Sequence, residues 1–190
     1  MLSVLRMNDY QTNEWSGGET TQLYIYPEIA NLADRDFTVR ISSATVNLEE
    51  SEFSDFSGYQ RFLQVLEGNI DLEHEGIASK HLPQFDYDYF SGDIPTTSKG
   101  RCRDFNVIYT PDVQVTNCLL SDGEAMDLKA TATYFFMNPQ PSAVTVEVGT
   151  ERITLGHLES IIVADEAATL HVSDGEPLVG VTMRMPKERA

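Results

Sequence analysis

Short runs of β-forming residues, separated by turn residues, are the feature that most constrains the fold of this chain. Valine, isoleucine, threonine, tyrosine and phenylalanine fill these runs, while glycine, proline, asparagine and aspartate gather between them. Stretches with the apolar spacing of an amphipathic helix are scarce. We expect strands at Leu2–Met7, Thr21–Tyr26, Phe37–Leu48, Phe62–Leu66, Ile70–Glu73, Asn106–Tyr109, Thr131–Phe136, Val144–Val148, Glu151–Leu155, Ser160–Val163, Ala168–Val172 and Leu178–Met185. About a dozen short strands predict an all-β sandwich or barrel.

The two halves of the chain share a plan. Residues 61–76 read "RFLQVLEGNIDLEHEG", an apolar strand, a turn, an alternating strand and a Gly turn, and residues 134–163 follow the same order. A duplicated β-barrel fits this pattern. We therefore expect two packed barrels in one compact unit, an N-terminal barrel at 1–110 with the candidate pocket and a C-terminal barrel at 111–190. A chain of 190 residues can bury the core that this requires.

The charge of the chain bears on its partners. Thirty acidic and thirteen basic residues give a net charge of −17, which disfavours binding to nucleic acid or to anionic membrane surfaces. No apolar run approaches the roughly 18–20 residues of a membrane helix, and "MLSVLRMNDY" lacks the pattern of a secretory signal. Cys102 and Cys118 lie in separate segments without the spacing of metal ligands, so we expect them to be ordinary thiols in a reducing compartment. We expect a cytoplasmic protein; whether it forms a homo-oligomer stays open.

Familiar catalytic and metal-binding motifs are missing from the sequence. His74, His81, His157 and His171 form no H-x-H, H-x-x-H or H-E-x-x-H pattern, so we expect neither a bound metal ion nor another cofactor. A G-x-S-x-G nucleophile elbow is also missing. The segment "WSGGET" lacks the lysine and the following helix of a phosphate-binding loop.

One predicted strand, "FTVRISSATVNL", carries polar residues on a single face. Alternation places Arg40 and Ser42 on one face and Val39 and Ile41 on the other. A guanidinium group can hold a planar carboxylate through two parallel hydrogen bonds, so this face could line a polar pocket. The alternative is a surface arginine on the solvent face of an ordinary sheet, and the spacing alone favours that alternative.

Two further segments offer polar partners for such a pocket. In "CRDFNVIYT", Asp104 and Asn106 share one strand face. Asp104 is either a pocket group or the counter-ion of an arginine, because an unpaired buried cation is very costly. Arg61 follows a Gly turn in "FSDFSGYQRFLQ" and is either a second pocket cation or the partner of an acidic residue. The phenylalanines Phe53 and Phe56 are expected to pack the corner before it.

Four sequence blocks, in order, resemble those of the HutD/Ves family, a group of metal-free two-barrel proteins in the cupin superfamily. The blocks are "WSGGETTQLYIYP", "DFTVRISSATVNLEESEFSDFSGYQRFLQVLEG", "YFSGDIPTTSKG" and "RDFNVIYT". They run from Trp15 to about Thr110, somewhat over half the chain. One departure stands in the first block, where the family has two more residues between the tryptophan and Gly-Glu-Thr.

The resemblance implies a bicupin fold of two packed cupin-like barrels with a pocket in the N-terminal one, no metal-binding histidines and no established enzymatic activity. Part of the family is encoded with histidine-degradation genes, which implies a regulatory or small-molecule-sensing role there. Trp15 would cap the pocket mouth, Gly17 and Gly18 would let the backbone turn tightly, and Thr20 or Thr21 would offer a hydroxyl. The alternative is that Trp15 only plugs one end of the barrel.

Three functions remain in competition at this point. The first, which we favour, is a metal-free binding protein for a small carboxylate, with a link to histidine utilisation left open. The second is a metal-independent enzyme, an isomerase or hydrolase that uses Asp104 or Glu19 as acid or base. The third is a filled structural barrel. The candidate ligand-binding residues are Trp15, Gly18, Thr20, Arg40, Ser42, Arg61, Asp104 and Asn106.

Overall fold

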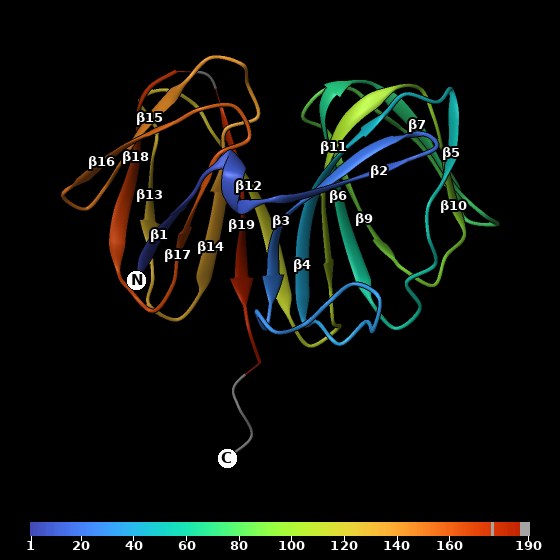
Figure 1. Ribbon diagram of the computed structural model, residues 1–190, viewed down its shortest axis with the longest axis horizontal. Coiled ribbons are helices and arrows are strands. Elements are labelled where there is room, and N and C mark those ends of the chain that lie inside the picture. The colour runs from blue at the N-terminus through green and yellow to red at the C-terminus, as the bar shows by residue number, and fades with distance from the viewer. Residues whose placement is uncertain (176, 187–190) are drawn as a thin grey trace. The chain divides into compact units, whose positions relative to one another are not determined.

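A computed structural model describes residues 1–175 and 177–186. Within these residues the elements are β-strands, apart from one short 3-10 helix, η1 (Met7–Asp9). The predicted all-β fold class is thereby confirmed. The strands group into two compact units, Tyr10–Pro111 and Met1–Asp9 with the chain from Asp112 onward (Figure 1).

The unit Tyr10–Pro111 contains two antiparallel sheets. The six-stranded sheet has the order β2-β3-β4-β11-β6-β9 and the four-stranded sheet the order β5-β10-β7-β8. The strands of the larger sheet are β2 (Gln11–Trp15), β3 (Gly18–Tyr26), β4 (Val39–Val46), β11 (Cys102–Tyr109), β6 (Gln60–Gly68) and β9 (Tyr87–Ser91). Those of the smaller sheet are β5 (Glu50–Glu52), β10 (Thr96–Lys99), β7 (Ile70–His74) and β8 (Ala78–Leu82).

Apolar side chains from both sheets meet in the core of this unit. Leu63 and Val65 of β6 cluster with Ile70 and Leu72 of β7, and each of the four is at most 1% exposed. Burying a side chain of this size contributes roughly 1.5–3 kcal/mol relative to leaving it in water. The alternation of β7, buried at residues 70, 72 and 74 and exposed at 71 and 73, is the sequence pattern of a strand with one face on the core.

The other unit also contains two antiparallel sheets, with the orders β1-β17-β14-β19-β12 and β13-β18-β15-β16. The strands of the first are β1 (Leu2–Leu5), β17 (Ser160–Val163), β14 (Thr133–Met137), β19 (Leu178–Arg184) and β12 (Gln114–Leu120). Those of the second are β13 (Ala125–Leu128), β18 (Ala168–Asp174), β15 (Val144–Val148) and β16 (Glu151–Leu155). One apolar cluster joins side chains of both sheets.

The first nine residues belong to this second unit, although we expected 1–110 to form the first barrel. Strand β1 pairs with β17 in antiparallel register, and Leu2 and Val4 pack against the apolar cluster of the second unit. The physical reason is the composition of β17: its four residues, SIIV, are all buried. Such a strand needs a neighbour on each side, and β14 and β1 provide them.

The paired glycines of "WSGGET" lie where β2 turns into β3, and at each position a side chain would clash with a different neighbour. A Cβ atom on Gly17 would lie 2.0 Å from Cζ3 of Trp15, so the indole ring packs directly over this glycine. Gly18 has a φ of +154°, and a Cβ atom there would lie 1.8 Å from the carbonyl oxygen of Thr45 on β4. Close approach of one backbone to another is therefore what requires Gly18.

We expect Gly18→Ala to lower the free energy of unfolding by about 3 kcal/mol or more, because the added methyl group cannot move away from backbone atoms. Gly58→Ala is the matched control: Gly58 also has a positive φ, +86°, but a Cβ atom there meets nothing within 4 Å. Urea unfolding measures both variants. Equal losses for the two substitutions would contradict the proposed close approach of Gly18 to Thr45.

Candidate functional site

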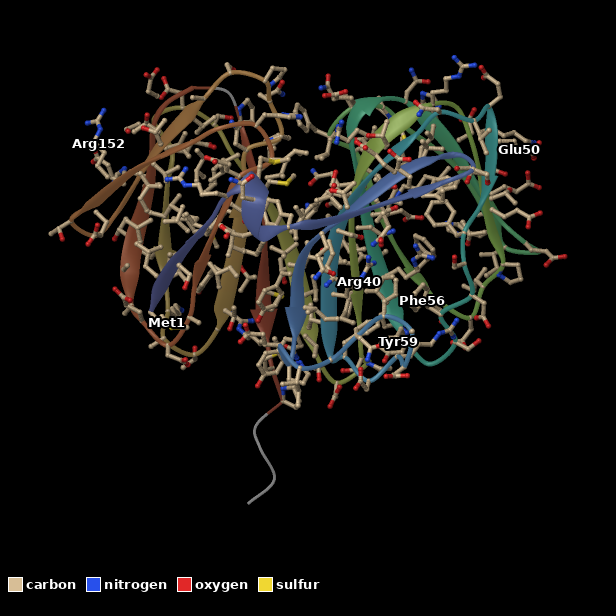
Figure 2. All side chains as sticks on the ribbon, viewed as in Figure 1. Met1, Arg40, Glu50, Phe56, Tyr59 and Arg152 are labelled. Atoms are coloured by element: carbon tan, nitrogen blue, oxygen red, sulfur yellow. The ribbon has the colours of Figure 1, made fainter. Side chains whose placement is uncertain are left out.

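A cavity of about 350 Å³ lies in the unit Tyr10–Pro111. Seven of the eight predicted site residues line it: Trp15, Thr20, Arg40, Ser42, Arg61, Asp104 and Asn106. Gly18 does not: it is the first residue of β3, where it pairs with Trp15 of β2. Figure 2 shows Arg40 and Phe56, which also lines the cavity, within this unit.

Strand register explains why residues far apart in the sequence converge here. Ser42 on β4 lies opposite Asn106 on β11, and Arg40 lies opposite Ile108. Ile108 in turn lies opposite Arg61 on β6. Since side chains alternate along each strand, these residues point to the same face of the sheet. The predicted faces of β4 and β11 are confirmed.

Arg40 is buried and held by neutral groups. Its side chain is 6% exposed, its Nε donates to Oε1 of Gln22 at 2.9 Å and its Nη1 donates to Oγ of Ser42 at 3.3 Å. Burial lowers the pKa of the guanidinium, and the nearby carboxylate of Asp104 opposes that shift. The second terminal nitrogen, Nη2, has no acceptor among the described residues.

Arg61 is buried among aromatic rings. Its guanidinium carbon lies 4.7 Å from the ring centre of Phe53, 5.5 Å from that of Phe90 and 5.7 Å from that of Phe56. Its Nη1 donates to the carbonyl oxygen of Ser54 at 3.2 Å, but its Nε is buried without a hydrogen-bond partner in the described part of the chain. Burial lowers its pKa to about 10; Asp104 opposes the shift and Arg40 adds to it.

Neither of these two arginines has a close carboxylate partner in the part of the chain that the structure describes. The ion pairs found there for arginine are Arg6–Glu159, Arg101–Glu49 and Arg152–Glu147. The close pair that we considered between Asp104 and an arginine is therefore not formed. Oδ1 of Asp104 instead accepts the backbone N–H of Ala44 at 3.1 Å.

Asp104 and Asn106 line the same cavity. Asp104 is 5% exposed, and burial raises its pKa to about 6 although the Ala44 N–H and the three arginines Arg61, Arg103 and Arg40 act in the opposite direction. Oδ1 of Asn106 is buried without a hydrogen-bond partner among the described residues. The cavity thus combines two fixed cations with a weakly acidic carboxyl group and an unsatisfied amide.

Sequence reasoning missed two residues that position the arginines. Gln22 holds Arg40, but it lies at a register shift of β3, between Gln22 and Tyr24, where simple alternation fails. Phe90 covers Arg61 from β9, a strand whose "YDYFS" sequence was not predicted. Phe53 and Phe56 were predicted only as corner packing, and their contact with Arg61 could have been inferred from their spacing in "FSDFSGYQR". Glu19, the alternative acid or base, does not line the cavity.

The histidines have other surroundings. Buried His74 contacts Oγ1 of Thr96 at 2.9 Å and Oδ2 of Asp88 at 2.8 Å. Among the residues described, no group of three or more histidine, cysteine, aspartate or glutamate side chains could hold a metal ion.

No helix in the described part of the chain is long and apolar enough to cross a membrane.

The burial of Asp104 should make stability depend on pH. Its folded-state pKa is raised to about 6, whereas an unfolded aspartate titrates near ~3.9. The folded state therefore binds the proton more tightly. The resulting stabilisation is fully present below pH ~4 and is lost as the pH rises through about 6.

Asp104→Asn cannot ionise, so its free energy of unfolding should gain roughly 2 kcal/mol relative to wild type between about pH 4 and pH 7.5. Urea unfolding at the two pH values measures this gain. Asp86→Asn, at an exposed position of the same unit, is the control for the substitution itself. A constant difference between Asp104→Asn and wild type would show that the carboxyl group of Asp104 is not desolvated.

Comparisons with known proteins agree with this description. The HutD family model matches residues 7–179. A stretch of 114 residues is 37% identical to the "Uncharacterized 21.2 kDa protein in hutC 3'region" of Pseudomonas putida, covering 58% of this chain and 59% of that protein's length. The structure of HutD from Pseudomonas fluorescens SBW25, described as a formate condition, has a TM-score of 0.75 and 25% identity over 97% of this chain and 100% of its own.

A more distant structure identifies the fold class. The cupin 2 conserved barrel domain protein from Leptotrichia buccalis has a TM-score of 0.60 at 11% identity, over 92% of each chain. That likeness shows the fold alone, which is the cupin fold. Because the family model covers most of its length, the chain belongs to the HutD family of cupin-fold proteins.

Proposed function

We propose that the unit Tyr10–Pro111 binds a small carboxylate in its cavity without the help of a metal ion. The observation that carries this proposal is the burial of Arg40 and Arg61 in one cavity with no close carboxylate partner among the described residues. An unpaired buried cation is costly, and two of them repel one another. An anionic ligand between them would offset both costs.

The free terminal nitrogens of the two guanidinium groups favour a carboxylate as that anion. Arg61 uses Nη1 on the Ser54 carbonyl and its Nε is fully enclosed, which leaves Nη2 for a ligand. Arg40 uses Nε and Nη1 on Gln22 and Ser42, which leaves Nη2. A carboxylate suits two such nitrogens because each of its oxygens can accept a charge-assisted hydrogen bond from one guanidinium group.

The aromatic rings around Arg61 support a binding role as well. Phe53, Phe56 and Phe90 cover the guanidinium and fix its direction, so little side-chain freedom is lost when a ligand binds. Trp15, which is 39% exposed, lines the same cavity and suits the cap that the sequence predicts for its mouth. A cavity with apolar walls and a few convergent polar groups is the usual form of a small-molecule site.

The proposal extends to a sensing or regulatory role in histidine utilisation inside the cytoplasm. It is supported by the HutD family match and by the hutC 3' region in the name of the P. putida relative. The free thiols of Cys102 and Cys118 are in keeping with a reducing compartment. A filled structural barrel is disfavoured by the cavity of about 350 Å³.

One observation supports an enzyme as the second candidate. Asp104 lines the cavity with a pKa raised to about 6 by burial, which is the range that suits a general acid or base near neutral pH. A metal-independent isomerase or hydrolase would use this carboxyl group. Conversion of a bound carboxylate, followed by NMR, separates the two candidates, because a binding protein returns its ligand unchanged.

We expect Arg40→Ala to weaken carboxylate binding by about 10- to 100-fold, because a hydrogen bond to a charged group is worth about 1.5–3 kcal/mol. Thermal shift with acetate, formate and the intermediates of histidine degradation measures the loss, since a ligand stabilises the folded state by mass action. Arg101→Ala is the control: this arginine is 65% exposed, pairs with Glu49 and does not line the cavity.

Equal shifts for wild type and Arg40→Ala across the whole panel would contradict the proposed site. A screen in which no carboxylate shifts the wild-type protein would contradict the proposed function itself. In both cases urea unfolding of the ligand-free variant shows whether the fold has survived.

A further inference from the structure

The cavity contains an acceptor that the carboxylate proposal does not use. Asp104 lines the cavity, and its Oδ1 is occupied by the N–H of Ala44. No donor in the described part of the chain occupies Oδ2, and Asp104 makes no close ion pair there. The side chain is only 5% exposed, but Oδ2 is not one of the fully enclosed polar atoms without a partner, so this oxygen is open to the cavity. A carboxylate oxygen there without a protein donor can accept a hydrogen bond from a ligand.

We propose that Asp104 selects carboxylates that carry a hydrogen-bond donor, such as a hydroxyl or N–H group, close to the carboxylate. This inference rests on the proposed function, since it names a subclass of its ligands. In the bound state the ligand carboxylate accepts hydrogen bonds from the arginines, and the ligand donor reaches Oδ2 of Asp104.

Strand register sets the distance between the two ends of the site. The Arg40 guanidinium reaches Oγ of Ser42, and Asp104 lies opposite Ala44, two residues further along β4. Two residues of strand correspond to roughly 7 Å. A 2-hydroxy acid has about 3 Å between its carboxylate and hydroxyl oxygens, and one hydrogen bond of about 2.8 Å at each end completes a span of this size. The ligand class is therefore small.

Asn106 lies between these two ends. It is opposite Ser42 in the register and lines the cavity, and its Oδ1 has no hydrogen-bond partner among the described residues. Oδ1 is fully enclosed, so the group that the amide can offer a ligand is its NH₂ donor, which suits a carboxylate or hydroxyl oxygen. A plain alkyl carboxylate would leave Oδ2 of Asp104 without a donor.

The charges of the cavity fit a ligand with one carboxylate. Arg40 and Arg61 contribute two positive charges, and ionised Asp104 contributes one negative charge. The other acidic residues that line the cavity, Glu14 and Glu52, are exposed and so lie where water screens them. The buried groups therefore leave a single positive charge, which one carboxylate neutralises.

Three small probes test the inference at about pH 7.5, where Asp104 is ionised: glycolate, acetate and methoxyacetate. Glycolate has the donor, acetate lacks the oxygen, and methoxyacetate keeps the oxygen as an acceptor but has no donor. Trp15, the only tryptophan, lines the cavity and reports binding by fluorescence, with calorimetry as a second measurement. We expect wild type to bind glycolate about 10-fold or more tightly than either other probe.

Asp104→Asn is the informative variant. If the new amide oxygen still accepts the hydrogen bond from the Ala44 N–H, the NH₂ group takes the place of Oδ2 in the cavity. A donor then replaces an acceptor. The preference for glycolate over methoxyacetate should then fall to about 3-fold or less, while acetate binds at least as well as before because a negative charge is gone. Asp86→Asn, at an exposed position, should keep the wild-type preference.

The outcomes separate this inference from the proposed function. Equal binding of glycolate and methoxyacetate to wild type overturns the role of Asp104 but leaves carboxylate binding intact. If Asp104→Asn keeps the wild-type preference for glycolate over methoxyacetate, a group other than Asp104 makes that selection. If none of the three probes binds, and the panel of carboxylates used for Arg40→Ala also fails, both proposals are overturned together.

Discussion

The burial of two guanidinium groups without a close carboxylate partner in the described chain is the constraint around which the N-terminal site is arranged. Arg40 is held by Gln22 and Ser42, and Arg61 by aromatic rings and one backbone carbonyl. These neutral contacts fix the direction of each cation but do not neutralise it. A carboxylate partner from the protein would have stabilised the fold more simply. Its absence leaves a charged, preorganised cavity that an external anion can complete.

The fold supplies this arrangement through strand register. Antiparallel pairing of β4 and β11 puts Ser42 opposite Asn106, and Ala44 opposite Asp104, so that acceptors and cations form successive rows on one face. The β2–β3 hairpin then carries Trp15 to the cavity, and the close approach of Gly18 to Thr45 holds the hairpin against β4. Burial raises the pKa of Asp104 to about 6 although the nearby cations act in the opposite direction, so the cavity can change its charge near neutral pH. The proposed binding and selectivity therefore depend on the same few residues as the stability of this unit.

Alternation in the sequence was sufficient to predict several of the strands that face an apolar core. The runs Val144–Val148, Glu151–Leu155 and Ser160–Val163 match the observed strands residue for residue. The missed strands include β2, "QTNEW", which is exposed throughout, and β10, "TTSK". Such segments have no apolar periodicity and become strands because a neighbour offers hydrogen bonds. For the same reason the pairing of β1 with β17 could not be predicted, since nothing local specifies a partner so far along the chain.

In the proposed function, an external anion neutralises Arg40 and Arg61. The most direct test is to determine crystal structures from crystals grown with acetate and from crystals grown without added carboxylate. The account predicts acetate density between the guanidinium groups of Arg40 and Arg61, with Asp104 still bonded to the N–H of Ala44 in both crystals. It would be contradicted by a cavity that holds only water in both crystals while either arginine turns to pair with Asp104, because the protein would then provide its own counter-ion.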